Sequence, residues 1–488
     1  MWLLPLFCLL APSLGSSPVR LLVEPPLRVW LRPPAEPRDA RAVGTAWVTV
    51  PVDHFNPLDD RTYQMRYMYN EQFFNGTGAP IFIMVGGEWE ISSGFLLTGN
   101  MFEMARENNG YLIYTEHRFY GRTQPFATHS TENLRYLNVD QALADLATFI
   151  GMLKEQPRFS TSPVILVGGS YAGNMVLWFK QRYAHLVLGT VASSAPIKAE
   201  VDFTGYLTVV ESAFRAEGGD ACAAVLRDGI AATVAATETA EGRELLEQVF
   251  KICPPPSDPL DYSDKFTMGY FSGFISWTLS GQVQNARPAE LRNLCNNLVN
   301  NVYGATPMES IGGLVTSGLS PGQCYEIRYE DYVNSYKNDA VSTGRAWYYQ
   351  TCTEYAYFQI APPTGSVFSP LSRWLNVEFY ADLCKQAYDS RFDESFVRAS
   401  VARSNRMFGG LRPDVNNTIN IHGAIDPWHY LGVVDRELKE SSPTYLVPRA
   451  SHCFDLQPWQ VTDTARMTQV QQAARRTVAT WLHEYYHK

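Results

Sequence analysis

One serine in the chain stands where a buried strand would turn sharply into a helix. The segment Val164–Met175 reads VILVGGSYAGNM, with Ser170 inside a run of small residues. A strand, a tight small-residue turn and a helix form the arrangement that exposes a nucleophilic serine above a sheet. Strict G-x-S-x-G spacing would need glycine at position 172, where alanine stands, but Gly168 and Gly173 keep the turn small. The alternative is an ordinary glycine-rich turn with an incidental serine.

A catalytic Ser170 requires a histidine and an acid, because a serine hydroxyl is a weak nucleophile without a base. Asp426 follows the short β-rich run 418–421, and His452 follows the run 443–447. Asp426 would orient the imidazole, and His452 would take the proton of Ser170 and deliver it to the leaving group. An aspartate before proline, taken alone, would indicate only the start of a turn.

Acyl transfer also requires backbone N–H donors that stabilise the developing oxyanion. Tyr171 follows the candidate nucleophile at the start of a helix, so its N–H is one candidate. Gly87, in the loop after the apolar run 81–85, is the second. A simple glycine turn at this position is the alternative.

The elements that would position these residues form an α/β pattern. The segments 46–52 and 63–69 alternate in polarity and predict a hairpin near a sheet edge. Three apolar runs separated by two helix-like stretches then indicate βαβ units and a mainly parallel sheet. These segments are 80–85, 95–107, 110–115, 139–155 and 163–167. Amphipathic helical patterns at 221–236, 240–250 and 288–303 indicate a helical insertion, and 462–486 predicts a closing helix.

Composition and terminal segments exclude several classes of protein. With 45% hydrophobic and 18% charged residues, the chain of 488 residues is not mainly disordered. Its net charge of -9 argues against nucleic acid as a partner. The apolar run Trp2–Leu14 is too short to span a bilayer and predicts a signal peptide, and no later run predicts a membrane helix. Sequons at Asn75 and Asn416 predict glycosylation in the secretory route.

Six motifs occur in one order along the chain and carry a family resemblance. They are EHRFYG at 116–121, GGSYAG at 168–173, ASSAP at 192–196, CTE at 352–354, DPW at 426–428 and SHC at 451–453. From about residue 45 onward the chain resembles the serine peptidase family of lysosomal Pro-Xaa carboxypeptidase, dipeptidyl peptidase II and thymus-specific serine protease. The segments 86–88 and 451–453 are most similar to the thymus-specific branch.

The resemblance implies an α/β-hydrolase fold with an inserted helical cap, and Ser170, Asp426 and His452 fall on the family's triad positions. We therefore expect the following division of the chain. It consists of a signal peptide at 1–17, an N-terminal arm at 18–44, a first hydrolase part at 45–200, a cap at 201–340 and a second hydrolase part at 341–488.

The resemblance also implies candidate substrate-binding residues. Trp428 falls on a position that walls the pocket for the residue before the cleaved bond, and an indole face suits a proline ring. Asn174 and Tyr357 stand where proline-selective members carry methionines, which argues against a strict proline preference. Glu88 either clamps a substrate amino terminus or is a structural carboxylate. We expect Arg118 and its neighbouring histidine to brace the fold rather than react.

Seven of the eight cysteines lie beyond the predicted signal peptide. The resemblance implies the disulfides Cys222–Cys295, Cys253–Cys324 and Cys352–Cys384, whereas spacing alone does not choose among the pairings. Cys453 would then be a free thiol beside the candidate base. We expect it to be a small packed side chain, with a redox or inhibitor-sensing role as the alternative.

The resulting hypothesis is a secreted or endolysosomal serine exopeptidase that forms an acyl-enzyme at Ser170. We expect a carboxypeptidase that acts on short peptides, with bonds next to proline among its targets. The alternatives are a dipeptidyl peptidase, an esterase, and a non-catalytic peptide-binding protein on the same fold. No metal-binding or nucleotide-binding motif is found, so we expect no metal and no organic cofactor. Peptides are the expected partners, and a homodimer is left open.

Overall fold

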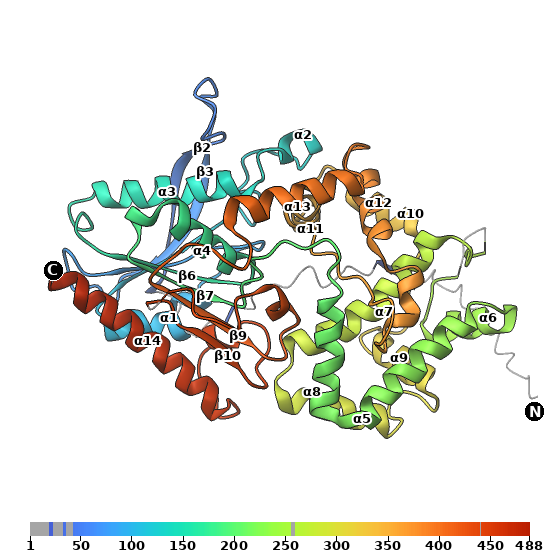
Figure 1. The fold of residues 1–488 in the computed structure, drawn as a ribbon. Coiled ribbons are helices and arrows are strands. Elements are labelled where there is room, and N and C mark those ends of the chain that lie inside the picture. The colour runs from blue at the N-terminus through green and yellow to red at the C-terminus, as the bar shows by residue number, and fades with distance from the viewer. Residues whose placement is uncertain (1–18, 23–32, 36–41, 255–258, 440) are drawn as a thin grey trace, which may run out of the picture.

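The computed structural model describes residues 19–22, 33–35, 42–254, 259–439 and 441–488. The predicted signal peptide at 1–17 lies outside the described residues, as does much of the arm at 18–44. Figure 1 shows a sheet flanked by helices at one end of the molecule and a group of helices at the other.

A single eight-stranded sheet organises the first of these parts. Its strand order is β10-β9-β7-β6-β4-β5-β3-β2. The strands are β2 (Gly44–Pro51), β3 (Thr62–Asn70), β4 (Ile81–Met84), β5 (Tyr111–Thr115), β6 (Val164–Gly169), β7 (Gly189–Ser193), β9 (Thr418–Gly423) and β10 (Thr444–Val447). β2 and β3 form the predicted antiparallel hairpin at one edge. The other six strands, in the sheet order β5-β4-β6-β7-β9-β10, pair in parallel with their neighbours. The residues of β4, β5, β6, β7 and β9 are all buried, as expected for strands covered on both faces.

Helices cover both faces of this sheet. In Figure 1, α3 (Val139–Glu155) and α4 (Tyr171–Arg182) lie on one face, and α1 (Asn100–Glu107) and α14 (Ala465–Tyr486) lie on the other. Short turns of helix at η2 (Gly94–Leu96), α2 (Thr131–Leu134), η3 (Ala184–Leu186), η6 (Pro427–Leu431) and η7 (Phe454–Leu456) lie in the connecting loops. An edge hairpin, a parallel centre and a strand β6 that turns sharply into α4 define the α/β-hydrolase fold.

The chain between β7 and β9 is almost entirely helical. Its elements are α5 (Gly205–Ala236), α6 (Ala240–Val249), α7 (Lys265–Asn285), α8 (Pro288–Val299), α9 (Pro307–Thr316), α10 (Tyr329–Lys337), α11 (Thr343–Gln350), η4 (Thr351–Tyr355), η5 (Ser369–Arg373), α12 (Val377–Ala387) and α13 (Glu394–Phe408). The helices therefore continue beyond residue 340, and the cap boundary expected there stays a proposal.

Part of the N-terminal arm contacts the fold. β1 (Val19–Leu22) pairs in parallel with β8 (Gln323–Glu326), which lies among the cap helices. Pro34 is buried, and its carbonyl oxygen lies where a side chain on Gly94 would stand. The described arm residues therefore contact the rest of the chain in two places. The four residues of β1, VRLL, are too short a run to indicate a strand partner so distant in the chain.

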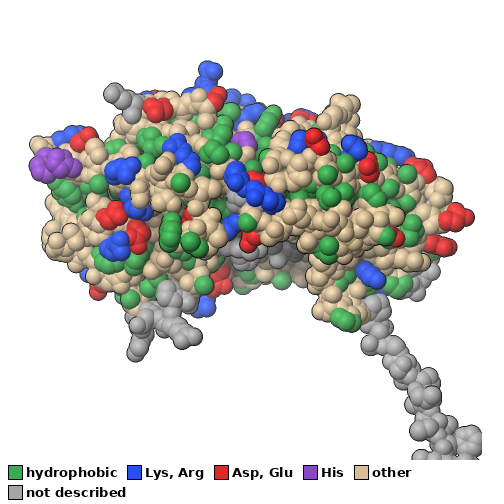
Figure 2. Space-filling model, turned by 90° about the horizontal axis from the view of Figure 1, so that it is seen from below, with side chains coloured by type: hydrophobic (Ala, Val, Ile, Leu, Met, Phe, Trp, Pro, Cys, Tyr) green, Lys and Arg blue, Asp and Glu red, His purple; other side chains and the backbone are tan. Residues whose placement is uncertain are grey.

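Three disulfides fasten the helical region. Cys222 joins Cys295 between α5 and α8, Cys253 joins Cys324 at β8, and Cys352 joins Cys384 between η4 and α12. Among the described helices, none combines the length and apolar character needed to cross a bilayer. On the face shown in Figure 2, basic and acidic side chains are both scattered over the surface.

Candidate active site

The turn between β6 and α4 holds Ser170 in a backbone conformation that residues other than glycine rarely adopt. Its φ is 59°, and its N–H donates to the carbonyl oxygen of Ser193 at 2.9 Å. A Cβ atom on Gly168 would lie 2.2 Å from the carbonyl oxygen of Ala172, and one on Gly173 would lie 2.9 Å from the carbonyl oxygen of Ser193. The backbone therefore requires glycine at 168 and 173 but accepts alanine at 172. Such locally strained turns are common at functional sites.

The loops after β9 and β10 bring the candidate acid and base together. His452 Nδ1 lies 2.9 Å from both carboxylate oxygens of Asp426, and Asp426 is fully buried. The Trp428 N–H also donates to Asp426 Oδ1 at 3.0 Å. Among the described residues, His452 Nε2 has no hydrogen-bond partner. This ring nitrogen is the one that a proton from a serine would reach.

Each member of this pair stabilises the charged form of the other. Burial alone would raise the pKa of Asp426, but the attraction and hydrogen bond of His452 outweigh it and hold that pKa below its usual value. Burial alone would lower the pKa of His452, yet Asp426 and the adjacent Cys453 raise it well above its usual range. The imidazolium that forms during acyl transfer is therefore stabilised in this site.

Two serines at the end of β7 connect the three candidate residues. The carbonyl oxygen of Ser193 accepts from the Ser170 N–H, and Ser194 Oγ accepts from the Cys453 N–H at 2.9 Å. Ser194 also bonds the carboxylate of Asp426, which lowers the pKa of that group. Asp455 Oδ1 accepts from Ser193 Oγ at 2.5 Å. This serine pair thus joins the loop of the nucleophile to the loops of the acid and the base.

The candidate oxyanion donors lie in the loops that follow β4 and β6. The N–H of Tyr171 is the first in α4, so it has no partner within the helix. Neither Tyr171 nor Gly87 donates its N–H to an acceptor among the described residues. Both donors stay predictions. The neighbouring Glu88 is 2% exposed, its Oε2 has no described partner, and burial raises its pKa to about 8.

The candidate substrate-binding residues gather around Trp428. Its ring packs against Tyr357 at 5.4 Å and against Tyr206 at 5.2 Å between centroids. Its Nε1 donates to Gln284 Oε1 at 3.0 Å. Asn174, on the first turn of α4, donates through Nδ2 to the hydroxyl of Tyr357 at 3.1 Å. The structure therefore brings Trp428, Tyr357 and Asn174 together from three segments far apart in the chain.

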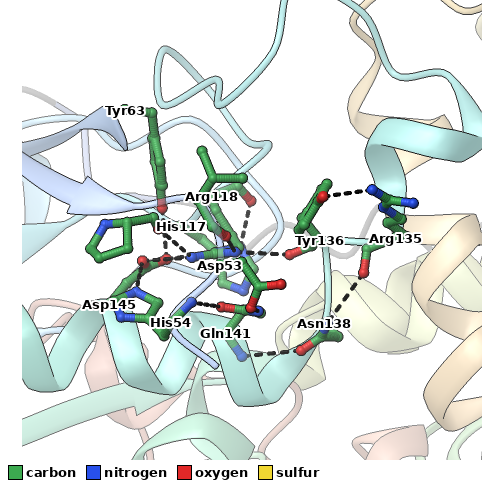
Figure 3. Close-up of polar contacts among 12 residues, drawn as sticks. Asp53, His54, Tyr63, His117, Arg118, Arg135, Tyr136, Asn138, Gln141 and Asp145 are labelled. Atoms are coloured by element: carbon green, nitrogen blue, oxygen red, sulfur yellow. Dashed lines mark hydrogen bonds and ion pairs between the residues drawn. The ribbon is translucent and has the colours of Figure 1, made fainter. Parts of the chain in front are cut away.

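A buried charged network joins the loop after β5 to α3, which lies on the same face of the sheet as α4 (Figure 1). Arg118 donates twice to Asp145, at 2.6 and 2.7 Å, and once each to the carbonyl oxygens of Val52 and Tyr136 at 2.9 Å. Figure 3 shows Arg118 within this network, where the Tyr63 hydroxyl and His54 also bond Asp145.

His117 connects this network to Tyr171, the residue after Ser170. His117 Nδ1 bonds the carbonyl oxygen of Arg118 at 2.7 Å, and its Nε2 bonds the hydroxyl of Tyr171 at 3.2 Å. Burial lowers the pKa of His117 to about 4, so the ring is neutral and both contacts are satisfied by one tautomer. These contacts agree with a bracing role for His117 and Arg118.

Four residues next to the site were not predicted as site residues from the sequence: Gln284, Ser193, Ser194 and Asp455. Ser193 and Ser194 lie within the ASSAP motif, and Asp455 lies three residues after His452, so proximity to these motifs was the available signal. Gln284 lies at the end of α7, and its carbonyl oxygen accepts from the Ser451 hydroxyl at 2.8 Å. Its sequence context carries no comparable signal.

Comparison with known proteins supports one family. The family model described as serine carboxypeptidase S28 matches residues 50–474. The thymus-specific serine protease of Mus musculus is 31% identical over 460 residues, covering 90% of this chain and 87% of that protein. The human thymus-specific serine protease is 29% identical over 453 residues, covering 89% and 86%. The human lysosomal Pro-X carboxypeptidase is 26% identical over 469 residues, covering 93% and 91%.

These matches confirm the resemblance that the motifs indicated, including the thymus-specific branch. They extend over the strained serine turn, the cap and the loops of the acid and base. The chain therefore belongs to the serine carboxypeptidase S28 family and is a serine-type peptidase.

Proposed function

We propose that the protein is a serine exopeptidase in which Ser170, Asp426 and His452 form the catalytic triad. His452 takes the Ser170 proton as the oxygen attacks the peptide carbonyl carbon, and Asp426 stabilises the imidazolium. The N–H groups of Tyr171 and Gly87 stabilise the oxyanion. The C–N bond then breaks as His452 passes its proton to the leaving amine, and water hydrolyses the acyl-enzyme by the reverse proton path.

The observation that carries the exopeptidase assignment is the contact between the cap and the base. The carbonyl oxygen of Gln284, at the end of α7, accepts a hydrogen bond from the backbone N–H of His452 at 3.4 Å. Ser170 is only 6% exposed and His452 only 7%. Such restricted access favours the end of a short peptide, which needs less room than a loop of a folded protein. We infer that substrates are short peptides or chain ends.

We propose carboxypeptidase action, which the family description supports, and dipeptidyl peptidase action as the second candidate. One observation favours the second mode. Glu88 is buried, and one oxygen of its carboxyl group has no hydrogen-bond partner among the described residues. His452 is the cationic group that acts on the pKa of Glu88, and it lowers this pKa. A substrate ammonium group would be a natural partner for such a carboxyl.

Peptides blocked at one end distinguish the two modes. A carboxypeptidase should release single residues from a peptide acetylated at its amino end and leave the carboxyl-terminal amide of the same sequence intact. A dipeptidyl peptidase should give the opposite result, with dipeptides in the mass spectrum. Equal cleavage of a doubly blocked peptide would contradict the exopeptidase assignment, and the esterase alternative is tested by the matching amino-acid ester.

We also propose that the protein is lumenal, in an endosome or lysosome, or secreted. The three disulfides require an oxidising compartment during folding. Asn75 and Asn416 are both exposed, as glycosylation would require. One of the relatives is named a lysosomal carboxypeptidase.

Buried ionisable groups predict an unusual dependence of stability on pH. Burial raises the pKa of three carboxyl groups, to about 8 for Glu88 and about 7 for Glu354 and Asp455. The folded protein keeps these protons after the unfolded chain has released them at about pH 4. Their contribution to stability therefore falls as pH rises from about 4 to about 8. His117, His129 and His422, whose pKa values burial lowers to about 4, act in the opposite direction, but only below about pH 6.5.

Above about pH 6.5 the effect of these three histidines has ended, and the raised pKa of His452 lowers stability with rising pH in the same direction as the three carboxyl groups. The free energy of unfolding should therefore fall between about pH 6.5 and 8. Urea unfolding at several pH values in this range measures the slope. The variant Glu88→Gln, which cannot ionise, should show a smaller decrease. A stability that is constant or rises over this interval would contradict the prediction.

A further inference from the structure

A hollow of about 670 Å³ lies between the loop that precedes β4 and the C-terminal end of α14. Asn75 lines it from the loop, and Tyr485 and Tyr486 line it from the helix. In Figure 1 the C-terminal end of α14 lies at the end of the molecule opposite the cap helices. The hollow has the size of a ligand site, about 300–1,000 Å³, but it belongs to a different part of the surface from the candidate active site.

Two tyrosine rings are held at the surface of this hollow. The Tyr486 hydroxyl donates to the carbonyl oxygen of Gly78 at 2.8 Å, and the Tyr485 hydroxyl donates to that of Thr161 at 3.0 Å. The ring centroids are 5.4 Å apart, with the planes nearly perpendicular. Tyr485 is nevertheless 40% exposed and Tyr486 is 48% exposed. Hydrogen bonds thus fix both rings while much of their apolar surface faces solvent.

The chemistry of the lining suits a carbohydrate. Among the residues that line the hollow, all of which the structure describes, no side chain carries a charge, so an ionic ligand would find no charged partner. Asn108, Asn109 and Thr161 contribute amide and hydroxyl groups. Such groups match the hydroxyl and acetamido groups of a sugar. The C–H groups on the face of a sugar ring pack against an aromatic ring, whose face is electron-rich.

The same hollow contains a candidate site of sugar attachment. Asn75 begins the sequon that continues with Gly76 and Thr77, and both Asn75 and Thr77 are exposed. No described atom lies within 4 Å of the point where a Cβ atom on Gly76 would stand, so the space beside the sequon is open. Because Asn75 itself lines the hollow, a sugar joined to its Nδ2 begins beside the two rings.

We propose that the glycan on Asn75 folds back into this hollow, where its first N-acetylglucosamine units pack on Tyr485 and Tyr486 and fasten the end of α14 to the loop before β4. The inference goes beyond the peptidase function and rests on the proposed lumenal location. Glycosylation joins Nδ2 to C1 of the first sugar of a lipid-linked oligosaccharide; the lipid diphosphate leaves, and the amide nitrogen loses one proton. Attachment keeps the sugar at a high effective concentration beside the rings, so weak contacts suffice.

Enzymatic release of the glycan from the native glycoprotein tests this contact. We expect peptide-N-glycosidase F to release the Asn75 glycan at least about tenfold more slowly from folded than from denatured protein, as measured by mass spectrometry of the peptide. In Tyr485→Leu/Tyr486→Leu, which keeps apolar bulk but removes the rings, this protection should be lost. The sequon at Asn416 lies outside the hollow, so the variant should not change the release of its glycan. Phe55→Leu, at a residue that is 60% exposed, is the matched control and should change neither rate.

Removing the glycan tests the same contact with both rings in place. Thr77→Ala abolishes the sequon, whereas Thr77→Ser keeps it. Amide hydrogen exchange in residues 480–488 should be at least about threefold faster in Thr77→Ala than in Thr77→Ser, because the end of α14 loses a contact. This pair decides the matter even where the double tyrosine variant does not fold.

Equal release of the Asn75 glycan from folded and denatured protein would overturn the inference. Unchanged protection in a folded Tyr485→Leu/Tyr486→Leu protein, or equal exchange in the two Thr77 variants, would do the same. A chain that carries a glycan on Asn416 but none on Asn75 would overturn the inference and leave the lumenal assignment intact, whereas a chain without either glycan would count against both.

The test is separate from that of the peptidase function. Peptide hydrolysis that depends on Ser170 should be equal in wild type and in all of these variants, because the hollow lies apart from the candidate active site. Loss of glycan protection with unchanged hydrolysis therefore bears on the contact alone, and absence of hydrolysis in wild type bears on the proposed peptidase function alone.

Discussion

Replacing Ser170 by alanine should lower peptide hydrolysis by about 10⁴-fold to 10⁶-fold while the protein stays folded. The reason is that the hydroxyl is the atom that forms the acyl-enzyme, and the remaining site offers only oxyanion stabilisation and binding. Alanine removes one oxygen from a residue that is 6% exposed, and the φ of 59° is set by the flanking backbone rather than by the side chain. Product formation measured by mass spectrometry gives the rate, and circular dichroism checks the fold.

A second variant and a matched control make this test sharper. If Ser170 and His452 act as one unit, the double variant Ser170→Ala/His452→Ala should be no slower than Ser170→Ala alone. Ser160→Ala, at an exposed serine, should keep full activity and full labelling by a fluorophosphonate. A Ser170→Ala protein that is folded and as active as wild type would exclude the proposed mechanism and revive the non-catalytic alternative for this residue.

The candidate triad could be predicted from sequence because each member follows an apolar strand and the order along the chain is restrictive. The carboxyl ends of parallel strands meet at one edge of a sheet, so we expect Ser170 to lie near Asp426 and His452, which follow it by more than 250 positions. The structure does bring Asp426 and His452 into contact. The glycines at 168 and 173 could likewise be recognised, because close backbone contacts leave no room for a Cβ atom there.

The cap and its contacts were harder to predict for physical reasons. α7 is buried on almost all sides, so it lacks the one-sided apolar period that marks an amphipathic helix. β1 pairs with β8 across most of the chain, and short strands carry little local signal. The hydrogen bond between the side chains of Trp428 and Gln284 joins residues that lie 144 positions apart in the sequence. Contacts of this kind arise from tertiary packing, which local patterns do not encode.

Replacing Arg118 by methionine should lower the free energy of unfolding by about 3–5 kcal/mol. Arg118 and Asp145 are both buried, and the guanidinium supplies two of the hydrogen bonds that the carboxylate accepts. Methionine has a similar length but no donor, so Asp145 would keep a buried charge with only Tyr63 and His54 as partners. Urea unfolding followed by tryptophan fluorescence measures the change against wild type.

The size of this effect should depend on the charge left behind, and two further variants isolate that cause. Arg118→Met/Asp145→Leu removes both charges and should recover much of the lost stability, because an apolar pair of similar volume replaces a buried ion pair at little net cost. Arg122→Met, in the same loop, removes an arginine whose side chain is 69% exposed and which pairs with Glu90 at 3.0 Å. That change should cost no more than about 1 kcal/mol, since exposed ion pairs contribute little. Equal losses for Arg118→Met and Arg122→Met would show that the buried network does not brace the turn that carries Ser170.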